Sequence, residues 1–382
     1  MKRKNSFKDS RPWYRRIGKG AVIALNMLVA LLMLLGGLSV WINPQTVAFP
    51  AYLGLFFPVL VLLNVLFIVF WLFLRDYWAV LSLVMMLLVG GQVVNTFACN
   101  FSDAAKNVSE APVLTMMSYN TMSCGQFAKA TKEKGNPVLD DIVKENPDVV
   151  CMQEFAVSKY KEYLQMADVK RVLKAYPYSH IEFTIDNKYK KMGIATFSKF
   201  PIIRKSNLDI ASSFNMAICS DIVVRGDTVR IFNCHLESNK LTEGDVKMQS
   251  DLMKDFDTKR AGDYAELVSK KLAEAYSFRA SQAQQISAAL EECTYPVLLC
   301  GDFNDVPVSY TYQTIKGKRL KDAFIENGFG FGLTFQKNLM NVRIDYIMHD
   351  DNFVAGDFQV GKTKYSDHYP IKCTIYRAEK HS

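Results

Sequence analysis

The stretch Cys300-Gly-Asp-Phe-Asn-Asp305 follows a run of strand-forming residues and ends in acidic and amide side chains. The stretches Arg343-Ile-Asp-Tyr346 and Ser366-Asp-His368 place carboxylate and imidazole groups in the same way. We therefore expect three strand ends to present a few groups to one point: Asp302, Asn304, Asp345, Asp367 and His368. Such a combination predicts metal-assisted hydrolysis of a phosphoester.

From about residue 112 onward the sequence alternates short strands with helices, which predicts an α/β fold of mixed sheets with helices outside. The turn Arg225-Gly-Asp-Thr228 joins two strands and makes them antiparallel. Asn136 and Pro137 are typical of a helix start, and apolar spacing predicts two more helices between His235 and residue 297. The predicted strands are 113–119, 149–153, 193–198, 216–224, 229–234, 297–300, 344–348 and 371–376.

The first hundred residues predict a membrane module. Residues 21–42, 51–74 and 77–97 each have the length of about 20 residues that crosses a bilayer core, with no charge inside. The first run is too long for the apolar core of a cleaved signal peptide, and two more runs follow it. We therefore expect three transmembrane helices. No acid or base lies inside them, so a channel or transporter is disfavoured.

Charge predicts how the module is oriented. Residues 1–20 carry eight Lys and Arg residues against the single Asp9, which is typical of a cytoplasmic flank that contacts anionic lipid. The turn Arg75-Asp76 then also lies inside, and everything after about Cys99 is periplasmic or extracellular. This arm accounts for nearly all of the net charge of +8. The rest of the chain lacks the strong positive charge typical of nucleic-acid-binding proteins.

The expected organisation is a basic arm (1–20), three helices (21–98), a polar linker (99–111) and a catalytic domain (112–382). The eight cysteines form no CxxC pair, and most lie in apparent strands, so neither a zinc site nor a disulfide framework is indicated.

Three further motifs occur upstream in the soluble part: Met117-Ser-Tyr-Asn-Thr121, Met152-Gln-Glu154 and Asn233-Cys-His-Leu-Glu-Ser238. With these six motifs in order, roughly residues 112 to 377 resemble the endonuclease/exonuclease/phosphatase superfamily. It includes deoxyribonuclease-I-like nucleases, apurinic-site endonucleases, inositol polyphosphate phosphatases and neutral sphingomyelinases. The resemblance implies a four-layer α/β sandwich, in which two mixed, mainly antiparallel sheets stack face to face, with helices on both outer faces and a cleft at one end.

The resemblance also implies a metal site. Glu154 matches the family's metal-binding position, and Asn120 matches the amide that supports the metal and the phosphate. Asp367 is expected to be a second metal ligand. Oxygen ligands of this kind suit Mg²⁺, with Mn²⁺ as the alternative.

The remaining residues have expected catalytic roles. Asp302 orients or deprotonates the attacking water, and Asn304 donates a hydrogen bond to a phosphoryl oxygen. His368 is either the general base or a cation on the phosphate, with Asp345 fixing its tautomer. The choice between Asp302 and His368 as base stays open. The resemblance implies that His235 contacts the phosphate and protonates the leaving oxygen, but the sequence identifies no acidic partner for it.

These residues predict a membrane-anchored, Mg²⁺-dependent phosphodiesterase outside the cytoplasm, with a metal-activated water attacking phosphorus. Three substrate classes remain open: nucleic acid, a phospholipid or sphingomyelin headgroup, and a phosphomonoester. A catalytically silent binding module is the alternative from a different class. It is disfavoured because neither the metal ligands nor the Asp345 and His368 pair is lost. No obligate protein partner is expected.

Overall fold

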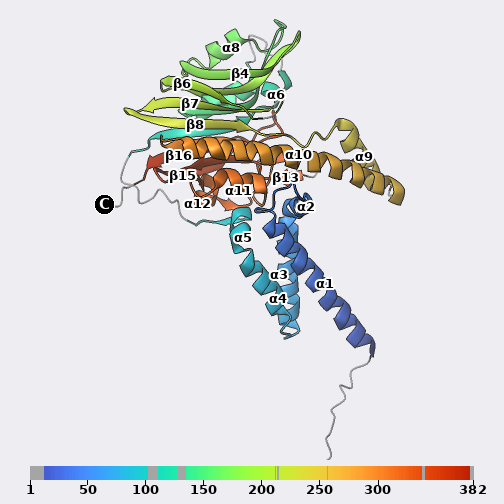
Figure 1. Cartoon of the computed structure of the whole chain (residues 1–382). Helices are drawn as coiled ribbons and strands as arrows, with labels where there is room; N and C mark the ends of the chain where they lie inside the picture. Colours follow the sequence, from blue (N-terminus) through green and yellow to red (C-terminus); the bar gives the residue numbers. More distant parts are fainter. Residues whose placement is uncertain are drawn as a thin grey trace, which may run out of the picture.

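The computed structural model describes residues 13–101, 111–127, 135–210, 212, 215–255, 257–337 and 340–378. Residues 1–12 of the expected basic arm and 102–110 of the expected linker lie outside the described residues. A large α/β part stands at one end of a narrow group of helices formed by the first hundred residues (Figure 1).

The α/β part contains two six-stranded mixed sheets. In order across the first sheet lie β10 (Lys321–Asp322), β14 (Asp345–His349), β9 (Val297–Asp302), β8 (Asp227–His235), β7 (Met216–Val224) and β6 (Ile202–Leu208). Across the second lie β15 (Phe353–Val360), β16 (Ile371–Arg377), β2 (Leu114–Asn120), β3 (Val149–Ser158), β5 (Lys190–Ser198) and β4 (Tyr178–Asp186). Each sheet has one parallel pair, β8 with β9 and β2 with β3, and its other pairs are antiparallel.

Apolar side chains stack these elements into four layers. A core between the sheets contains Leu114 and Val149 of one sheet and Ile231 and Leu298 of the other. A second core lies under the outer helices α10 (Thr258–Glu292) and α11 (Tyr310–Lys316). A third lies under α7 (Pro137–Glu145) and α8 (Met166–Val172). The predicted α/β sandwich is therefore confirmed.

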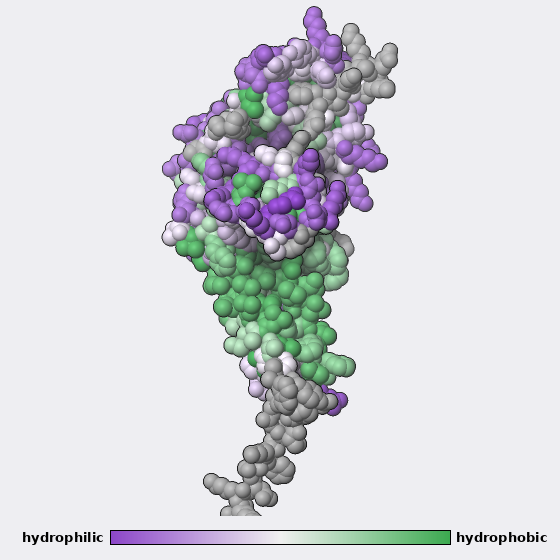
Figure 2. Space-filling view, turned by 90° about the vertical axis from the view of Figure 1, so that its right-hand side faces the viewer, coloured by the Kyte–Doolittle hydropathy of each residue, from purple (hydrophilic) through white to green (hydrophobic). Residues whose placement is uncertain are grey.

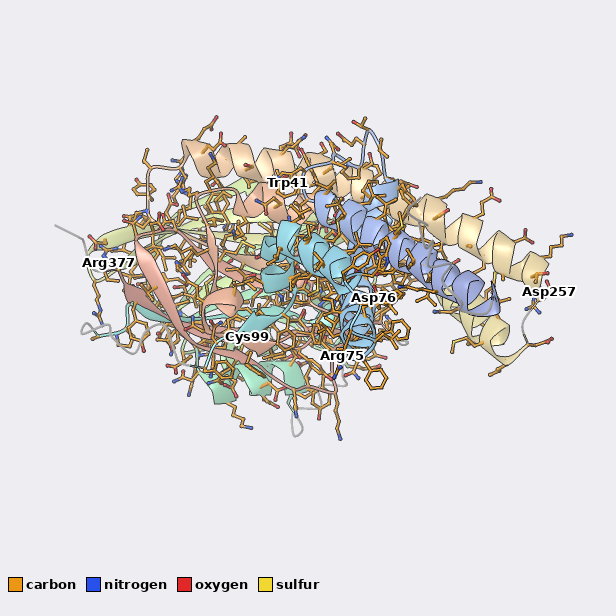
Figure 3. All side chains as sticks on the ribbon, turned by 90° about the horizontal axis from the view of Figure 1, so that it is seen from below. Trp41, Arg75, Asp76, Cys99, Asp257 and Arg377 are labelled. Carbon is orange, nitrogen blue, oxygen red and sulfur yellow. The ribbon has the colours of Figure 1, made fainter. Side chains whose placement is uncertain are left out.

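Local sequence signals explain several element boundaries. The Asn136 side chain accepts hydrogen bonds from the amides of Val138 and Leu139, which caps α7 as expected. Arg225 and Gly226 both have positive φ, 52° and 91°, and form the hairpin turn between β7 and β8. The two helices expected after His235 are α9 (Glu243–Lys254) and α10. Figure 3 shows Asp257, the N-cap of α10, at the far end of the arm that these helices form.

The helices of the first hundred residues differ from the expected three continuous spans. By length and composition, Gly18–Leu38 is the one described helix that qualifies alone to cross a membrane. The other two candidates are bent pairs. The helices α2 (Phe49–Leu55) and α3 (Phe57–Phe73) meet at 70°, and α4 (Ala79–Leu88) and α5 (Gly90–Thr96) meet at 76°. Pro58 is the second residue of α3 and Gly90 is the first of α5, so residues that weaken a continuous helix lie at both bends. The helix α1 itself runs over Trp13–Leu38.

Buried amides hold these helices together. The Asn26 side chain donates to the hydroxyl of Ser82 at 2.7 Å and accepts from the indole of Trp71 at 2.9 Å. Figure 3, seen from below, shows Arg75 and Asp76 at the turn between α3 and α4. Lys19, near the start of α1, forms an ion pair with Asp76. The start of α1 and this turn therefore lie together, away from the α/β part.

The helices are joined to the α/β part through backbone as well as side chains. Short strands β1 (Ala98–Cys99) and β11 (Phe329–Gly330) pair antiparallel, and Arg343 donates to the carbonyl of Asn95 at 2.7 Å. The Tyr52 hydroxyl of α2 donates to the Ser269 carbonyl of α10 at 2.7 Å. A second pair of short strands in the described residues is β12 (Phe335–Lys337) with β13 (Met340–Val342). The remaining short helices are α6 (Met122–Phe127) and α12 (Ala323–Asn327).

Candidate active site

Strand register places three predicted residues in one row across the first sheet. Asp302 ends β9 and lies opposite His235, the last residue of the parallel strand β8. On its other side Asp302 faces Asp345, the first residue of the antiparallel strand β14. The expectation that Asp345 and His368 follow strands is wrong, because Asp345 begins β14 and His368 precedes β16. Antiparallel pairing still brings the start of β14 to the edge where β9 ends.

The second sheet contributes Asn120 and Glu154 to the same edge. Asn120 ends β2 and is in register with Gln153 on the parallel strand β3. A bulge in β3 between Met152 and Phe155 interrupts its pairing with β5 at Glu154. Bulges re-aim side chains and recur beside active sites. The predicted Gln153-Glu154 motif therefore lies at an irregularity that sets the direction of the Glu154 side chain.

Strained backbone is concentrated at this edge. Glu154 and Asn304 have φ of 50° and 52°, in the left-handed region that non-glycine residues seldom adopt. Just after Asn120, the residues Met122, Ser123 and Cys124 also have positive φ. Each such residue costs about 1–2 kcal/mol and persists only where its surroundings enforce it. Clustered strain of this kind is typical of a functional site.

One carboxylate oxygen, Oδ2 of Asp302, is the centre of the arrangement. It accepts hydrogen bonds from the amides of Asn120 at 2.8 Å and Asn304 at 3.3 Å. It also lies 3.7 Å from Nε2 of both His235 and His368. Burial raises the pKa of Asp302, although the two imidazoles act in the opposite direction. Four predicted site residues, Asn120, Asn304, His235 and His368, thus surround Asp302.

His368 is held by Asp345. The His368 Nδ1 lies 2.9 Å from Oδ2 of Asp345, the arrangement of a carboxylate that orients an imidazole. Burial by itself lowers the pKa of His368, but the carboxylates of Asp345 and Asp302 outweigh it and raise the pKa to about 10. In the absence of a bound metal His368 is therefore a cation at neutral pH.

The pKa of His235 shifts in the opposite direction to that of His368. It is buried, and burial lowers its pKa despite the neighbouring Asp302 carboxylate. The sequence identifies no acidic partner for His235. In the structure Asp302, which is already expected to orient or deprotonate the attacking water, lies 3.7 Å from Nε2 of His235. A neutral imidazole at this position donates an N–H hydrogen bond rather than holding a positive charge.

Glu154 and Asp367 lie on the second-sheet side of the cavity. The Glu154 carboxylate is 3.5 Å from the amide of Asn120, and burial raises its pKa, with His368 lowering it and Asp367 raising it further. The Asp367 carboxylate is 2.9 Å from Nζ of Lys337, an ion pair that the sequence did not indicate. In the described residues, a buried group of Asp302, Asp345 and His368 has metal-ligating atoms within 4.8 Å of one another. It overlaps the predicted catalytic residues rather than the predicted metal ligands.

Supporting residues hold the catalytic ones in place. The Thr334 hydroxyl accepts from the amides of Ile344 and Asp345, both at 3.1 Å, and fixes the start of β14. The Ser366 hydroxyl donates to the Asn120 carbonyl at 2.8 Å and accepts from the His368 amide at 3.1 Å. Thr334 has no signal in the sequence, because its partners are distant in the chain. Ser366 could have been identified from the sequence, because it belongs to the Ser366-Asp-His368 motif and has a hydroxyl that can form hydrogen bonds.

The site opens into a cavity of about 290 Å³. Its walls include Glu154, Asp302, Asn304, Asp367 and His368. Leu55, from the end of α2, also lines it, so the first hundred residues contribute a side chain to the cavity. No sequence pattern indicates Leu55 as a site residue, because its position depends on how two parts of the chain pack together.

Fold and site together define a hydrolase that acts on phosphoester bonds. The model of the Endonuclease/Exonuclease/phosphatase family matches residues 117–368, and the chain belongs to this family. Enzymes of the family depend on a metal. Residues 19–97 match a separate model, described as a domain of unknown function (DUF8431).

Individual relatives are distant. The chain is 23% identical over 253 residues to the CCR4-Not complex 3'-5'-exoribonuclease subunit Ccr4 of Candida albicans, which covers 57% of this chain but only 30% of that protein. A Leptotrichia buccalis family protein has a TM-score of 0.48 at 16% identity, covering 69% of this chain and 99% of that one. The human Nocturnin catalytic domain, with bound sulfate, has a TM-score of 0.47 at 15% identity, covering 70% and 96%.

Proposed function

We propose that the chain is a membrane-anchored, Mg²⁺-dependent phosphodiesterase whose catalytic domain, from about residue 112 onward, lies outside the cytoplasm. The observation that carries the proposal is the convergence on Oδ2 of Asp302, where two amides and two imidazoles from both sheets meet. This is a set of groups suited to bind a tetrahedral phosphoryl group and to move protons on either side of it.

Glu154 is the main metal ligand of the proposal, with Asn120 beside it and Asp367 as a second ligand. The donor set fits a hard cation: the Glu154 carboxylate has only a long 3.5 Å contact to the Asn120 amide, and burial disfavours its charge. Asp367 is the weaker ligand, since its carboxylate pairs with Lys337. Mg²⁺ takes one or two carboxylates and keeps several waters, and Mn²⁺ fits the same oxygens. When bound, the metal acts as a Lewis acid that neutralises charge on the phosphoryl oxygens.

The chain's own groups then divide the remaining work. Asp302 accepts the proton of the attacking water, because burial raises its pKa towards the range of a base working near neutral pH. His368, with its pKa raised to about 10, keeps its proton and places a positive charge against the phosphate. Asn120 and Asn304 donate their amide hydrogens to phosphoryl oxygens. The directions of these two pKa shifts favour Asp302 over His368 as the general base.

His235 is the proposed donor to the leaving oxygen. It lies across Asp302 from Asp345 in the strand register, on the far side of the site from the His368 pair. Because burial lowers its pKa, its contribution at neutral pH is a hydrogen bond from a neutral ring, which strengthens as negative charge develops on the leaving oxygen.

The membrane anchoring rests on the first hundred residues. One helix has the length and composition to cross a bilayer, and each bent pair has them jointly, which is consistent with three passes. The ion pair of Lys19 with Asp76 puts the start of α1 and the turn after α3 at one end, opposite the α/β part. Together with the Lys- and Arg-rich first residues, this arrangement supports a cytoplasmic N-terminus and an external catalytic domain.

The test is metal-dependent turnover by the full-length chain. Hydrolysis of bis-p-nitrophenyl phosphate is measured with Mg²⁺, with Mn²⁺ and with EDTA. We expect Glu154→Gln to raise the Mg²⁺ concentration needed for activity and His368→Gln to lower kcat by about 10²–10⁴-fold. Glu162→Gln is the matched control, because Glu162 is exposed and lies outside the cavity. Turnover that survives EDTA, or equal activity of Glu154→Gln and Glu162→Gln, would contradict the proposal.

A further inference from the structure

A second cavity adjoins the catalytic one. It has a volume of about 260 Å³, close to the 290 Å³ of the catalytic cavity. The two cavities share three lining residues: Leu55, Val306 and Val342. Their common wall is therefore apolar, and no charged side chain is shared between them.

One loop leads from the first cavity to the second. It starts at Asp302 and Asn304, continues through Val306 in the shared wall, and reaches Val308, which lines only the second cavity. The groups proposed to bind the phosphate thus lie at one end of this loop, and an apolar surface lies at the other. Strand β13 also leads from one cavity to the other: Met340 lines the catalytic cavity, and Val342 lines both cavities.

The second cavity lies at the junction with the helices of the first hundred residues. Gly54 and Pro58, from α2 and α3, line it together with Val308 and Leu333 of the α/β part. The approach is close: a Cβ on Gly54 would lie 2.3 Å from the Val308 carbonyl oxygen. This carbonyl also accepts a hydrogen bond from the Ser39 hydroxyl at 3.2 Å. The junction therefore fixes the cavity between the two parts of the chain.

The second cavity is lined mainly by apolar residues, with Thr96, Asn341 and Arg343 as its polar lining residues. Two of its lining residues, Phe331 and Leu333, are 44% and 40% exposed. Phe56, between Leu55 and α3, is 59% exposed. Figure 2 shows an apolar surface that covers the helices and reaches the lower edge of the α/β part. A hydrocarbon chain beside α3 would meet mainly apolar side chains in this cavity.

We propose that the substrate is an amphiphilic phosphoester of the bilayer, with its phosphate in the catalytic cavity and part of its hydrocarbon tail in the second cavity. This inference rests on the proposed function and assigns the substrate class to it. A water-soluble phosphoester with only small polar substituents gains nothing by entering an apolar cavity. The near-neutral charge of the chain beyond its basic arm is also better suited to a substrate with few phosphates.

The experiment uses the full-length chain in lipid nanodiscs and a series of p-nitrophenyl alkyl phosphate diesters, from ethyl to dodecyl. Release of p-nitrophenolate gives kcat/KM for each diester. The variants are Leu333→Trp, which fills the second cavity, Leu333→Ala, which enlarges it, and Leu267→Trp as the matched control. Leu267 is 38% exposed, close to the 40% of Leu333, but lies on α10 and lines neither cavity. Partitioning of the diesters into the nanodisc is the same for every variant, so the comparison isolates the cavity.

We expect kcat/KM of the wild type to rise by up to about fourfold for each methylene that enters the cavity. Leu333→Trp should reduce the ratio of dodecyl to ethyl turnover at least tenfold relative to Leu267→Trp, and Leu333→Ala should move the optimum to longer tails. An unchanged ratio in both Leu333 variants overturns the tail site while leaving the hydrolase in place. If the wild type hydrolyses none of the diesters in a metal-dependent way, the proposed function itself fails. Should Leu333→Trp lose ethyl turnover through misfolding, the shift in Leu333→Ala decides.

Discussion

At the scale of single residues, the site separates its acids and bases by their partners. Asp345 lies 2.9 Å from the ring of His368, whereas Asp302 is held by amides and lies 3.7 Å from both imidazoles. The first arrangement stabilises a cation on His368. In the second, burial raises the pKa of Asp302 even though the His368 ring lies 3.7 Å away and lowers it. One acid therefore orients a cation and the other is suited to accept a proton.

The substitution Asp345→Asn tests the first of these roles. It keeps the shape of the side chain but removes the charge that raises the pKa of His368. We expect kcat on bis-p-nitrophenyl phosphate to fall by about 10²–10⁴-fold and the alkaline limb of its pH profile to move to lower pH. Asp351→Asn is the control, because the Asp351 side chain is 79% exposed on the surface. A fall in kcat with an unmoved alkaline limb would mean that Asp345 acts only by packing.

His368 should also make stability depend on pH. Its pKa in the folded chain is about 10, above its ordinary value of 6.5, so folding favours the protonated form. Its contribution is therefore fully present below 6.5 and is lost as the pH rises through about 10. In EDTA, the Tm of the wild type should exceed that of His368→Gln most at low pH, and the difference should shrink towards high pH. The same difference at both extremes would contradict the raised pKa.

The predicted site residues could be found from sequence because each stands in a short motif. Their approach to one another could not, since it depends on register: Asp302 faces Asp345 only because β14 runs antiparallel to β9. Asp345 and His368 were expected to follow strands, but Asp345 begins β14 and His368 precedes β16. The residues do lie together, although the strand geometry expected for them was wrong.

At the scale of elements, the strands that the sequence did not reveal lie at the edges of the sheets. Edge strands β4, β6, β10 and β15 were all missed. An edge strand has one neighbour and more exposed surface, so its residues need not form an apolar run. In β6, for example, Arg204, Lys205 and Asn207 are exposed. The inner strand β7, Met216–Val224, is buried on both faces and has the predicted bounds. The other inner strands were predicted too, but with bounds that differ at one or both ends.

Gly301 lies on β9 where this strand approaches β8 closely, so a larger residue at this position should disturb the pairing. Gly301 has a φ of 146°, and a Cβ there would lie 1.9 Å from the Cys234 carbonyl oxygen. Gly301→Ala should push β9 from β8 next to the pair of His235 and Asp302, lowering both Tm and turnover. Gly262→Ala is the matched control: Gly262 lies inside α10 with no neighbouring atom within 4 Å, and the change should stabilise by about 0.5–1 kcal/mol. Equal Tm values for the two variants would contradict the register described here.

At the scale of the whole molecule, the helices and the α/β part share a junction that reaches the site. Arg343 is buried, pairs with Asp322 at 2.6 Å and donates to the Asn95 carbonyl at the end of α5 at 2.7 Å. Two residues further along the chain lies Asp345, which orients His368. The helices are therefore connected through one side chain to the start of β14. Composition predicted an anchor, but no local pattern predicted that the anchor would contact the catalytic part so closely.

The proposed orientation of the helices in a membrane can be tested with cysteine chemistry. The structure describes all eight cysteines as free, and Cys99 alone among them is exposed. A membrane-impermeant maleimide added to intact cells, whose outer layer admits it, should therefore label the folded protein at Cys99, on the catalytic side of the membrane. In a Cys99→Ser background, Tyr77→Cys places a thiol at the opposite end of the helices, where Tyr77 is 75% exposed. We expect that variant to react only after the membrane is permeabilised. Labelling of Tyr77→Cys but not Cys99 in intact cells would reverse the orientation, because both ends report on the same helices. It would also place the apolar cavity beside the inner leaflet, so that its amphiphile would have to come from the cytoplasmic side.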